Sequence, residues 1–195
     1  MPETNAVTSP NAAKQRCAWA NPNNPRYLDY HDNEWGVPCH DDRDLFELLV
    51  LEGFQAGLSW ECILNKRPAF KRAFEDFDVE KVAGYDEEKV QKLKGDKGIV
   101  RNEGKIRAAI TNARVFMQIQ EERGSFDAYL WSFTEGKTVF EDYRFAATSA
   151  LSNRVSADLK KRGMKYVGST IVQSYLQATG ILNAHEPGCY KYRKG

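Results

Sequence analysis

Four residues whose side chains bind metals stand at the two ends of this chain. Cys17 and His31 lie near its start, and His185 and Cys189 lie near its end with an H-x3-C spacing that suits one turn. Thiolates and imidazoles in a Cys2His2 set suit tetrahedral zinc, and four protein ligands leave no position for a reacting water. The sequence therefore predicts a structural clasp that joins both ends of one domain, and it directs the search for chemistry elsewhere.

The size and composition of the chain fit one domain. With 195 residues, 42% of them hydrophobic and 12% aromatic, the chain can bury one sizeable core. The net charge of +1 means that any nucleic-acid-binding surface has to be a local patch. No apolar run is long enough to span a membrane, and the start lacks the features of a signal peptide. We expect a disordered polar tail at 1–15, a single domain at 16–190 and a second tail at 191–195.

Hydrophobic residues recur with a helical period through most of the chain, which predicts an all-α fold. The strongest amphipathic run extends from Ile106 to Met117. Two further helices are expected at about 149–162 and 169–179, with an irregular segment at 134–148 that has room for a short extended piece. A helix is expected to end at Leu64, and Pro68 suits the first turn of the next one. Small polar residues that favour helix N-caps precede several runs: Asp41 or Asp42, Ser59, Asp78 and Asp86.

The most basic stretch joins two expected helices at 87–94 and 105–121. Between residues 89 and 107 seven lysines and arginines outnumber two acidic residues, for a local charge of +5. Glycines in the connection let backbone approach a partner, and the second helix presents its N-terminal amides, an arrangement that binds phosphate. We therefore predict DNA contacts here, and solvated helix faces are the alternative. A second basic cluster, at 154–165, has a local charge of +4.

An aromatic group surrounds one glutamate in the first third of the chain. Glu52 ends an apolar helical run, LVLEG, where a solvated carboxylate is unexpected. The aromatic residues are Trp19, Tyr27, Tyr30, Trp35 and Trp60. Most tryptophans and tyrosines serve core packing. Together with a carboxylate, however, they can form a slot that stacks a planar base while the carboxylate reads its amino group. The spacing leaves both interpretations open.

Several long segments resemble, in order, the bacterial 3-methyladenine DNA glycosylase I family, known as the Tag family: RCAWA, YLDYHDNEWGVP, LFELLVLEGFQAGLSW, KGIVRNEGKIRAAITNAR, LKKRGMKYVGSTIVQSYLQATG and HEPGC. The resemblance spans about residues 17–189. It implies a helix-hairpin-helix DNA glycosylase fold, with the hairpin at about 87–121 and a structural Zn2+ on the four clasp residues. It also implies a monofunctional hydrolase of base excision repair that flips and excises 3-methyladenine from double-stranded DNA, acting as a cytoplasmic monomer.

The resemblance assigns base recognition to Glu52, supported by Tyr30 and Trp60, with weaker support for Tyr27, Trp19 and Ser174. It places Gly57 and Leu58 where they fill the space of the extruded nucleotide. The hairpin residues expected to contact DNA are Gly98, Arg101, Gly104 and Lys105. The stretch RNEGK has one glycine where the wider superfamily has two, and Asp127 is no clear counterpart of that superfamily's catalytic aspartate. Because His31 directly follows Tyr30, we expect the metal to hold one wall of the base pocket.

The implied mechanism requires little acid catalysis. Methylation at N3 gives adenine a positive charge that weakens the glycosidic bond. We expect a buried, ionised Glu52 to accept hydrogen bonds from the adenine edge and to reject guanine, and Trp60 to favour a cationic ring. Three alternatives stay open: a zinc-stapled DNA-binding module without catalysis, a strand-cleaving lyase that uses the amine of Lys105, and a zinc hydrolase with an open coordination position. Cys39 and Cys62 are expected to be ordinary thiols, and His40 a surface residue.

Overall fold

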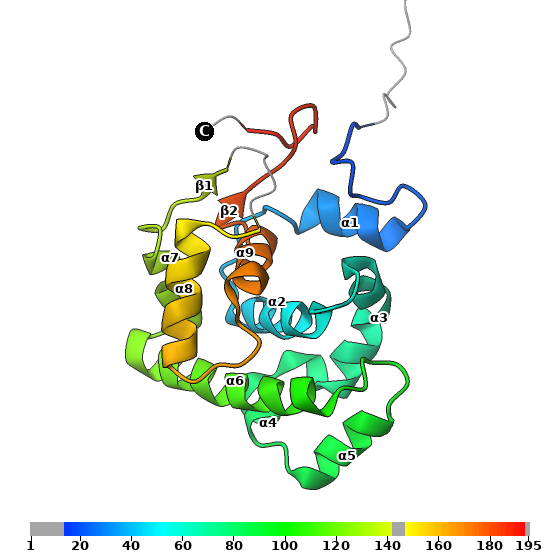
Figure 1. The fold of residues 1–195 in the computed structure, drawn as a ribbon, viewed down its shortest axis with the longest axis vertical. Coiled ribbons are helices and arrows are strands. Elements are labelled where there is room, and N and C mark those ends of the chain that lie inside the picture. Colours follow the sequence, from blue (N-terminus) through cyan, green and yellow to red (C-terminus); the bar gives the residue numbers. More distant parts are fainter. Residues whose placement is uncertain (1–13, 142–146, 194–195) are drawn as a thin grey trace, which may run out of the picture.

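The structure, a computed structural model, describes residues 14–141 and 147–193, and within them the chain is mostly helical (Figure 1). The elements follow the chain in this order: α1 (Pro25–Asn33), α2 (Asp42–Gln55), α3 (Trp60–Ala73), the 3-10 helix η1 (Glu75–Phe77), α4 (Val79–Ala83), α5 (Glu87–Gly95), α6 (Glu103–Arg123), α7 (Phe126–Ser132), β1 (Val139–Phe140), α8 (Ala150–Lys161), α9 (Ser169–Ala178) and β2 (Leu182–Asn183). The prediction of a helical fold is confirmed. None of the helices in these ranges has the length and apolar character needed to cross a bilayer.

Several helices begin where the sequence predicted N-caps. The carboxylate of Asp41 accepts hydrogen bonds from two backbone N–H groups in the first turn of α2. Ser59, Asp78 and Asp86 accept in the same way at the starts of α3, α4 and α5. These contacts satisfy backbone donors that a first helical turn leaves without partners. Local sequence therefore decides where these helices start.

Pro68 lies inside α3, which differs from the prediction. The sequence predicts one helix that ends at Leu64 and a second that starts at Pro68, whereas α3 runs unbroken from Trp60 to Ala73. An internal proline removes a backbone hydrogen bond and crowds the preceding turn, at a cost of about 3 kcal/mol. Phe70, two residues later, is fully buried and packs its ring against Phe54 with 4.9 Å between centroids. Burial of this helix face offsets the local cost.

Helix α2 passes through the middle of the molecule, where α3, α6, α7 and α9 pack against it (Figure 1). Every residue from Leu45 to Glu52 is buried. A helix that is covered around its whole circumference has no solvent-facing side for a charged residue. Glu52 therefore lies in the interior because of the position of α2, which explains why this glutamate follows an apolar run.

Helices α5 and α6 form a hairpin at the end of the molecule opposite the chain termini (Figure 1). The amphipathic run predicted for α6 is confirmed, since Ile106, Ala109, Ile110 and Ala113 are buried and Met117 is half-buried. This apolar side packs against α2 and α4. The connection between the two helices is thereby held at the molecular surface.

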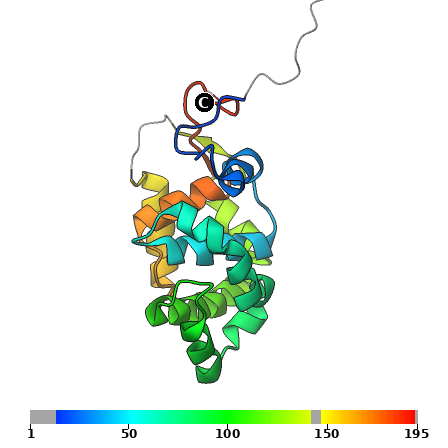
Figure 2. The same cartoon turned by 90° about the vertical axis from the view of Figure 1, so that its right-hand side faces the viewer.

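The two ends of the described chain lie side by side at one pole of the molecule (Figures 1 and 2). The backbone N–H of Tyr190 donates to the carbonyl of Gln15 at 2.8 Å, and Lys191 Nζ donates to the carbonyl of Asp32 at 2.6 Å. A two-residue parallel pair, β1 with β2, adds to this pole by pairing Val139 with Leu182. Contacts thus extend slightly beyond the predicted domain limits of 16 and 190. Most of the predicted tails (1–13 and 194–195) and part of the irregular segment (142–146) lie outside the described residues.

Candidate active site

A small cavity among α1, α2, α9 and the start of α3 contains Glu52. Its volume is about 180 Å³, less than the roughly 300–1,000 Å³ of pockets for drug-sized ligands, so it suits one small planar group. The lining residues are Trp19, Tyr27, Tyr30, Trp35, Glu52, Gln55, Trp60, Ser174 and Gln177. Every residue predicted to contact a base is among them. The structure thus brings together side chains from four separate parts of the sequence.

Glu52 has no charged or hydrogen-bonding partner in the described parts of the chain. Glu52 is only 3% exposed. Burial alone raises the pKa of its carboxyl group to about 8. Glu47, on the same helix, is equally buried but pairs with Arg67 at 2.7 Å. With this pKa, Glu52 is mostly protonated at pH 7, whereas the sequence-based hypothesis expected it to be ionised. An ionised Glu52 requires a cation or a hydrogen-bond donor beside it.

Aromatic rings form the walls of this cavity. The rings of Tyr30 and Trp60 have centroids 5.2 Å apart and planes inclined by 50°. Trp60 Nε1 is a buried donor without an acceptor among the described residues, and such a group is one that a ligand acceptor satisfies. Burial, and then the charge of Glu52, raises the pKa of Tyr30 well above its usual value, so its hydroxyl stays neutral.

Two lining residues, Gln55 and Gln177, were not predicted at all, and Trp35 was predicted only as a member of the aromatic group and not as a base contact. Both glutamines carry a signal that could have identified them. Gln55 lies three residues after Glu52, and Gln177 lies three residues after Ser174, which puts each pair on one face of a helix. The ring of Trp35 lies 4.8 Å from that of Trp19. This spatial contact could not be read from the chain.

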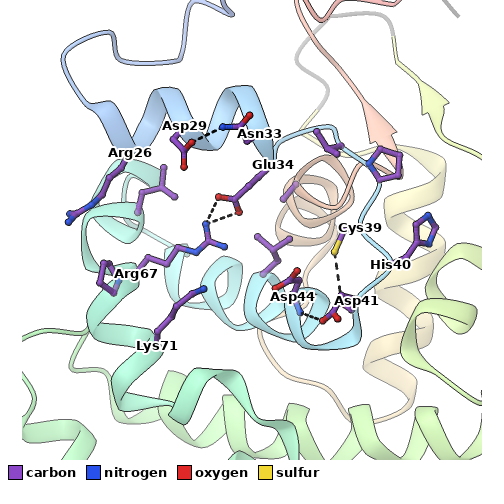
Figure 3. A pocket seen from close by; sticks show the side chains of 16 residues that line it. Arg26, Asp29, Asn33, Glu34, Cys39, His40, Asp41, Asp44, Arg67 and Lys71 are labelled. Atoms are coloured by element: carbon purple, nitrogen blue, oxygen red, sulfur yellow. Dashed lines mark hydrogen bonds and ion pairs between the residues drawn. The ribbon is translucent and has the colours of Figure 1, made fainter.

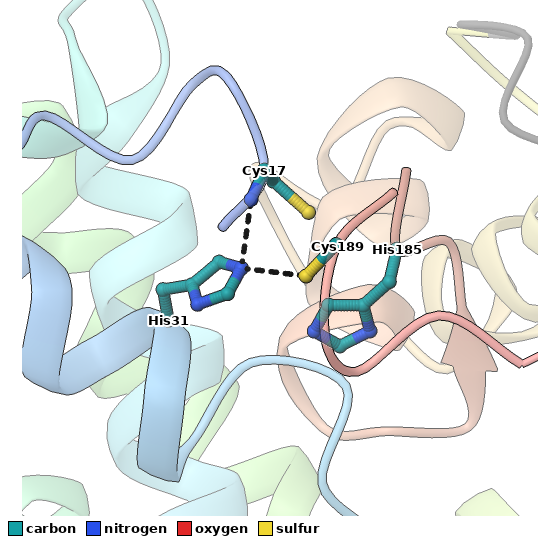
Figure 4. A group of neighbouring side chains, drawn as sticks. All are labelled: Cys17, His31, His185 and Cys189. Atoms are coloured by element: carbon teal, nitrogen blue, oxygen red, sulfur yellow. Dashed lines mark hydrogen bonds between the residues drawn. The ribbon is translucent and has the colours of Figure 1, made fainter. Parts of the chain in front are cut away.

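The four predicted metal ligands form a buried cluster (Figure 4). One ligand atom from each of Cys17, His31, His185 and Cys189 lies within 4.8 Å of all the others. Four such atoms around a tetrahedral zinc ion would be roughly 3.3–3.8 Å apart, so small side-chain movements suffice. Burial lowers the pKa of His185 to about 4, which keeps its imidazole in the neutral form that binds metals. The cluster could therefore hold a metal ion.

Hydrogen bonds orient both imidazoles of this cluster. His31 Nδ1 lies 2.9 Å from Asp32 Oδ1, and Arg16 in turn holds the Asp32 carboxylate at 2.6 and 2.8 Å. His185 Nδ1 lies 2.9 Å from Asn183 Oδ1. The buried Nε2 of His185 has no partner among the described residues. Metal-bound histidines usually bond in this way through their second nitrogen, so the donor set fits a metal ion.

Two tryptophans connect the Cys/His cluster to the cavity. The ring of Trp35 lies 4.6 Å from the ring of His185, and the ring of Trp19 lies 5.2 Å from that of His31. Both tryptophans also line the cavity that holds Glu52. The cluster therefore packs against the same aromatic wall that faces the cavity, through these tryptophans as well as through the expected sequence neighbour Tyr30.

The connection between α5 and α6 is built around its glycines. The Asp96 carboxylate accepts a hydrogen bond from the N–H of Gly98 at 2.7 Å. A Cβ at Gly98 would come within 2.9 Å of the Cβ of Ala69, so a larger residue does not fit without a shift. Arg101 and Gly104 are exposed at the start of α6. These three residues occupy the surface on which the sequence placed DNA contacts.

A shallow groove of about 570 Å³ runs beside this connection. It is lined by basic and apolar residues of two regions: Leu58, Cys62, Lys66, Lys94, Lys97, Ile99, Val100 and Arg101. Leu58 is 39% exposed, and the preceding Gly57 has a φ of +82°, which favours glycine. The turn at Gly57 and Leu58 and the hairpin therefore share one basic surface. Part of the counted charge is neutralised there, because Lys94 pairs with Glu103 at 2.7 Å.

Lys105 differs from the predicted DNA contacts. The residue is only 8% exposed, and its Nζ donates to the carbonyls of Phe54 at 2.8 Å and Ala56 at 2.6 Å. Sequence position suggested a phosphate contact because Lys105 stands in the first turn of a basic helix. The packing of α6 against the end of α2 instead turns the ammonium inward.

The second basic cluster and Asp127 make contacts within the protein and lie away from the cavity around Glu52. Arg162, from the second basic cluster, pairs with Glu122 at 2.6 Å and Asp158 at 2.8 Å. Asp127 accepts a bond from the exposed His40 at 2.8 Å and does not line the cavity. His40 is thus a surface residue, as predicted, and Asp127 is not placed to act on a group bound near Glu52.

A larger hollow of about 660 Å³ lies between α1, α2 and α3 (Figure 3). One ion pair crosses it: Arg67 donates to both carboxylate oxygens of Glu34, each at 2.7 Å, and also to the buried Glu47 behind it. The described residues that line it include no Phe, Tyr or Trp. This hollow therefore lacks the stacking surfaces of the smaller cavity, despite its greater volume.

Comparison with known proteins agrees with this geometry. A family model described as methyladenine glycosylase matches residues 19–192. DNA-3-methyladenine glycosylase 1 of Escherichia coli (strain K12) is 44% identical over 91% of this chain and 97% of its own length. DNA-3-methyladenine glycosylase of Haemophilus influenzae is 34% identical over 89% of this chain and 96% of its own.

Solved structures match over similar lengths. A crystal structure of 3-methyladenine DNA glycosylase I superposes with a TM-score of 0.87 at 42% identity and covers 92% of this chain and 100% of its own. The Staphylococcus aureus enzyme, studied for its recognition of 3-methyladenine, gives a TM-score of 0.87 at 36% identity and covers 94% and 99%. Such similarity places the fold among the DNA glycosylases, which hydrolyse the bond between a base and its sugar. The chain belongs to the methyladenine glycosylase family. The expected enzyme class, a 3-methyladenine DNA glycosylase of DNA repair, is confirmed.

Proposed function

We propose that the chain flips 3-methyladenine out of double-stranded DNA, binds it in the cavity around Glu52 and hydrolyses its N-glycosidic bond. The observation that carries this proposal is a buried carboxyl without a partner among the described residues, enclosed by Trp and Tyr rings. A cationic base beside Glu52 favours loss of the carboxyl proton, since an opposite charge stabilises the ionised form. The ionised carboxylate then accepts a hydrogen bond from the adenine amino group, whereas guanine would present an oxygen.

The aromatic walls contribute selectivity for the damaged base. The faces of Trp60 and Tyr30 attract a cationic ring, an effect of about 0.5–2 kcal/mol depending on desolvation. Tyr27, Trp19 and Ser174 complete the slot. Methylation already weakens the glycosidic bond, so the enzyme mainly extrudes the nucleotide, at a cost of a few kcal/mol, and selects the base. No strong acid is then needed in the cavity.

The connection between α5 and α6, together with the turn at Gly57 and Leu58, binds the DNA in this proposal. Gly98, Gly104 and Arg101 present backbone amides and positive charge to the phosphates of one strand. Gly57 and Leu58, on the neighbouring turn, fill the gap that the flipped nucleotide leaves. The cavity, the hairpin and the turn all belong to one chain, which supports a monomer. Chromosomal DNA as the substrate supports a cytoplasmic location.

The Cys/His cluster holds a structural zinc ion in this proposal. All four ligand positions come from the protein, and no position is left for a reacting water. Bound zinc supplies folding energy and ties both chain ends together. Through Trp19 and Trp35 it also steadies one wall of the cavity.

The direct test is incubation with methylated duplex DNA followed by chromatography of the released bases. We expect release of 3-methyladenine without 7-methylguanine, and strongly reduced release by Glu52→Gln. DNA binding without base release would favour a binding module. Borohydride trapping of a covalent adduct that Lys105→Ala abolishes would favour a lyase. Metal-edge spectroscopy that shows a water on the metal would favour a zinc hydrolase.

A further inference from the structure

Lys105 is a buried lysine without a carboxylate partner in the described chain. Lysines are almost never fully buried unless they are paired. Here the partners are two backbone carbonyls, those of Phe54 and Ala56. The ammonium therefore reaches from α6 across to α2, and these two bonds are its only side-chain hydrogen bonds within the described chain. Such an arrangement needs a reason beyond solubility or surface charge.

The two carbonyls belong to the end of the helix that carries Glu52. The last carbonyls of a helix have no partner within it, and they bear a partial negative charge. Helix α2 ends at Gln55 with Ala56 as its C-cap, and the turn through Gly57 returns a backbone N–H to the carbonyl of Gln55 but leaves those of Phe54 and Ala56 without a backbone donor in the described chain. Lys105 supplies the missing donors from a different helix. The end of α2 is therefore positioned by α6.

The next residues form a short turn that is closed on itself. The N–H of Leu58 donates to the carbonyl of Gln55 at 2.7 Å. Gln55 Nε2 donates back to the carbonyl of Leu58 at 2.8 Å. These two hydrogen bonds restrict the turn that carries the exposed Leu58. Lys105 binds the residues just before this turn, at the carbonyls of Phe54 and Ala56. A shift of the Lys105 contact would move Leu58 and the end of α2 together.

Lys105 also belongs to the hairpin itself. Its backbone N–H donates to the N-cap side chain of Asn102 at 3.1 Å, in the first turn of α6. A second lysine, Lys66 of α3, donates to the carbonyls of Lys97 and Gly98 at 3.2 Å each. The turn between α2 and α3 is thus tied to the hairpin on both sides. A phosphate held by the hairpin then fixes the position of Leu58.

We propose that Lys105 is a positioning residue that locks the Leu58 turn to the DNA-gripping hairpin and thereby sets how deeply Leu58 enters the duplex. This role rests on the proposed function, in which Leu58 fills the gap left by the flipped base. It differs from a phosphate contact and from a lyase nucleophile, since both of those need an accessible ammonium. In this role the charge acts on the protein's own backbone.

Three variants separate these roles. Lys105→Met keeps the length of the side chain but removes both hydrogen bonds. Lys105→Arg retains donors for the two carbonyls. Arg101→Met removes an exposed positive charge from the same hairpin and serves as the matched control. Each is compared with the wild type for zinc content, melting temperature, affinity for undamaged duplex at several salt concentrations, binding of free 3-methyladenine, and single-turnover release of that base from methylated duplex.

We expect Lys105→Met to bind free 3-methyladenine as the wild type does, and to bind undamaged duplex with an unchanged salt dependence. Single-turnover release should slow by roughly 10- to 100-fold, because the reacting groups are misplaced. Lys105→Arg should recover part of that rate. Arg101→Met should lower the slope of log affinity against log salt by about 0.9, as loss of one phosphate contact does. In a Leu58→Ala background, Lys105→Met should have little further effect on release, because both changes act through the same turn.

Other results would overturn the inference. A salt slope that falls in Lys105→Met as it does in Arg101→Met would identify Lys105 as a phosphate contact. Unchanged release by a folded Lys105→Met, or full additivity with Leu58→Ala, would exclude a positioning role. Should Lys105→Met fail to fold, Lys105→Gln, which keeps one donor group, is measured in the same way. A wild type that releases no base would refute the proposed function itself, and this role with it.

Discussion

Replacing Glu52 by Gln is expected to stabilise the fold while it impairs base release, and the stabilisation should grow with pH. Glu52 is 3% exposed, and its carboxyl has a pKa of about 8 against a reference of 4.5. Between these two values the folded protein keeps a proton that the unfolded chain releases. Wild-type stability therefore falls as the pH rises from about 4.5 to about 8. A neutral amide at this position removes that dependence.

The size of the effect follows from the pKa difference. At about 1.36 kcal/mol per pKa unit, the ionisable group costs about 1 kcal/mol at pH 5, about 3 kcal/mol at pH 7 and about 5 kcal/mol at pH 9. Glu52→Gln conserves the shape of the side chain, so the gain in free energy of unfolding should follow these values. At pH 7 this gain corresponds to a rise in Tm of roughly 6–12 °C for a chain of this length.

The assay is urea unfolding of the wild type and of Glu52→Gln at the three pH values, with base release measured on the same preparations. Glu47→Gln is the matched control, because Glu47 is also buried on α2 but pairs with Arg67. That variant should be destabilised. A gain for Glu52→Gln that is equal at all pH values, or a loss, would refute the reasoning about an unpaired carboxyl. Near-normal release would refute its role in base recognition and leave the stability argument intact.

Three further predictions concern the same cavity and cluster. Because the ionised carboxylate is the form that receives a cationic base, kcat/KM should fall as the pH drops below about 8, and a pH profile that stays the same in Glu52→Gln would contradict this. Trp60→Leu should lower kcat/KM for release from methylated duplex, in which the base is cationic, by about 2- to 30-fold, whereas an unchanged value would remove Trp60 from the site. Chelation of the metal should lower Tm and helicity, with both restored by added Zn2+; a metal-free protein with full stability and activity would exclude the clasp.

Features that depend only on residues close by in the sequence could be predicted without the structure. The N-caps at Asp41 and Ser59 are confirmed because a cap is satisfied within its own first turn. Pro68 shows the limit of such rules, since its local cost is overcome by the burial of Phe70 in a core formed by other helices. The Cys/His cluster could be predicted because few residue types bind zinc and the chain has only three histidines.

The sequence by itself determined the helical class, the family, the four residues of the Cys/His cluster and the aromatic group around Glu52, since each is encoded by residue type, order or spacing. Only the tertiary structure decided the protonation of Glu52 and the direction of the Lys105 ammonium. Both depend on what surrounds a side chain in space. Glu52 lacks the partner that Glu47 has, although both lie on α2. Lys105 meets carbonyls about 50 residues away, because the packing of α6 on α2 turns its side chain inward.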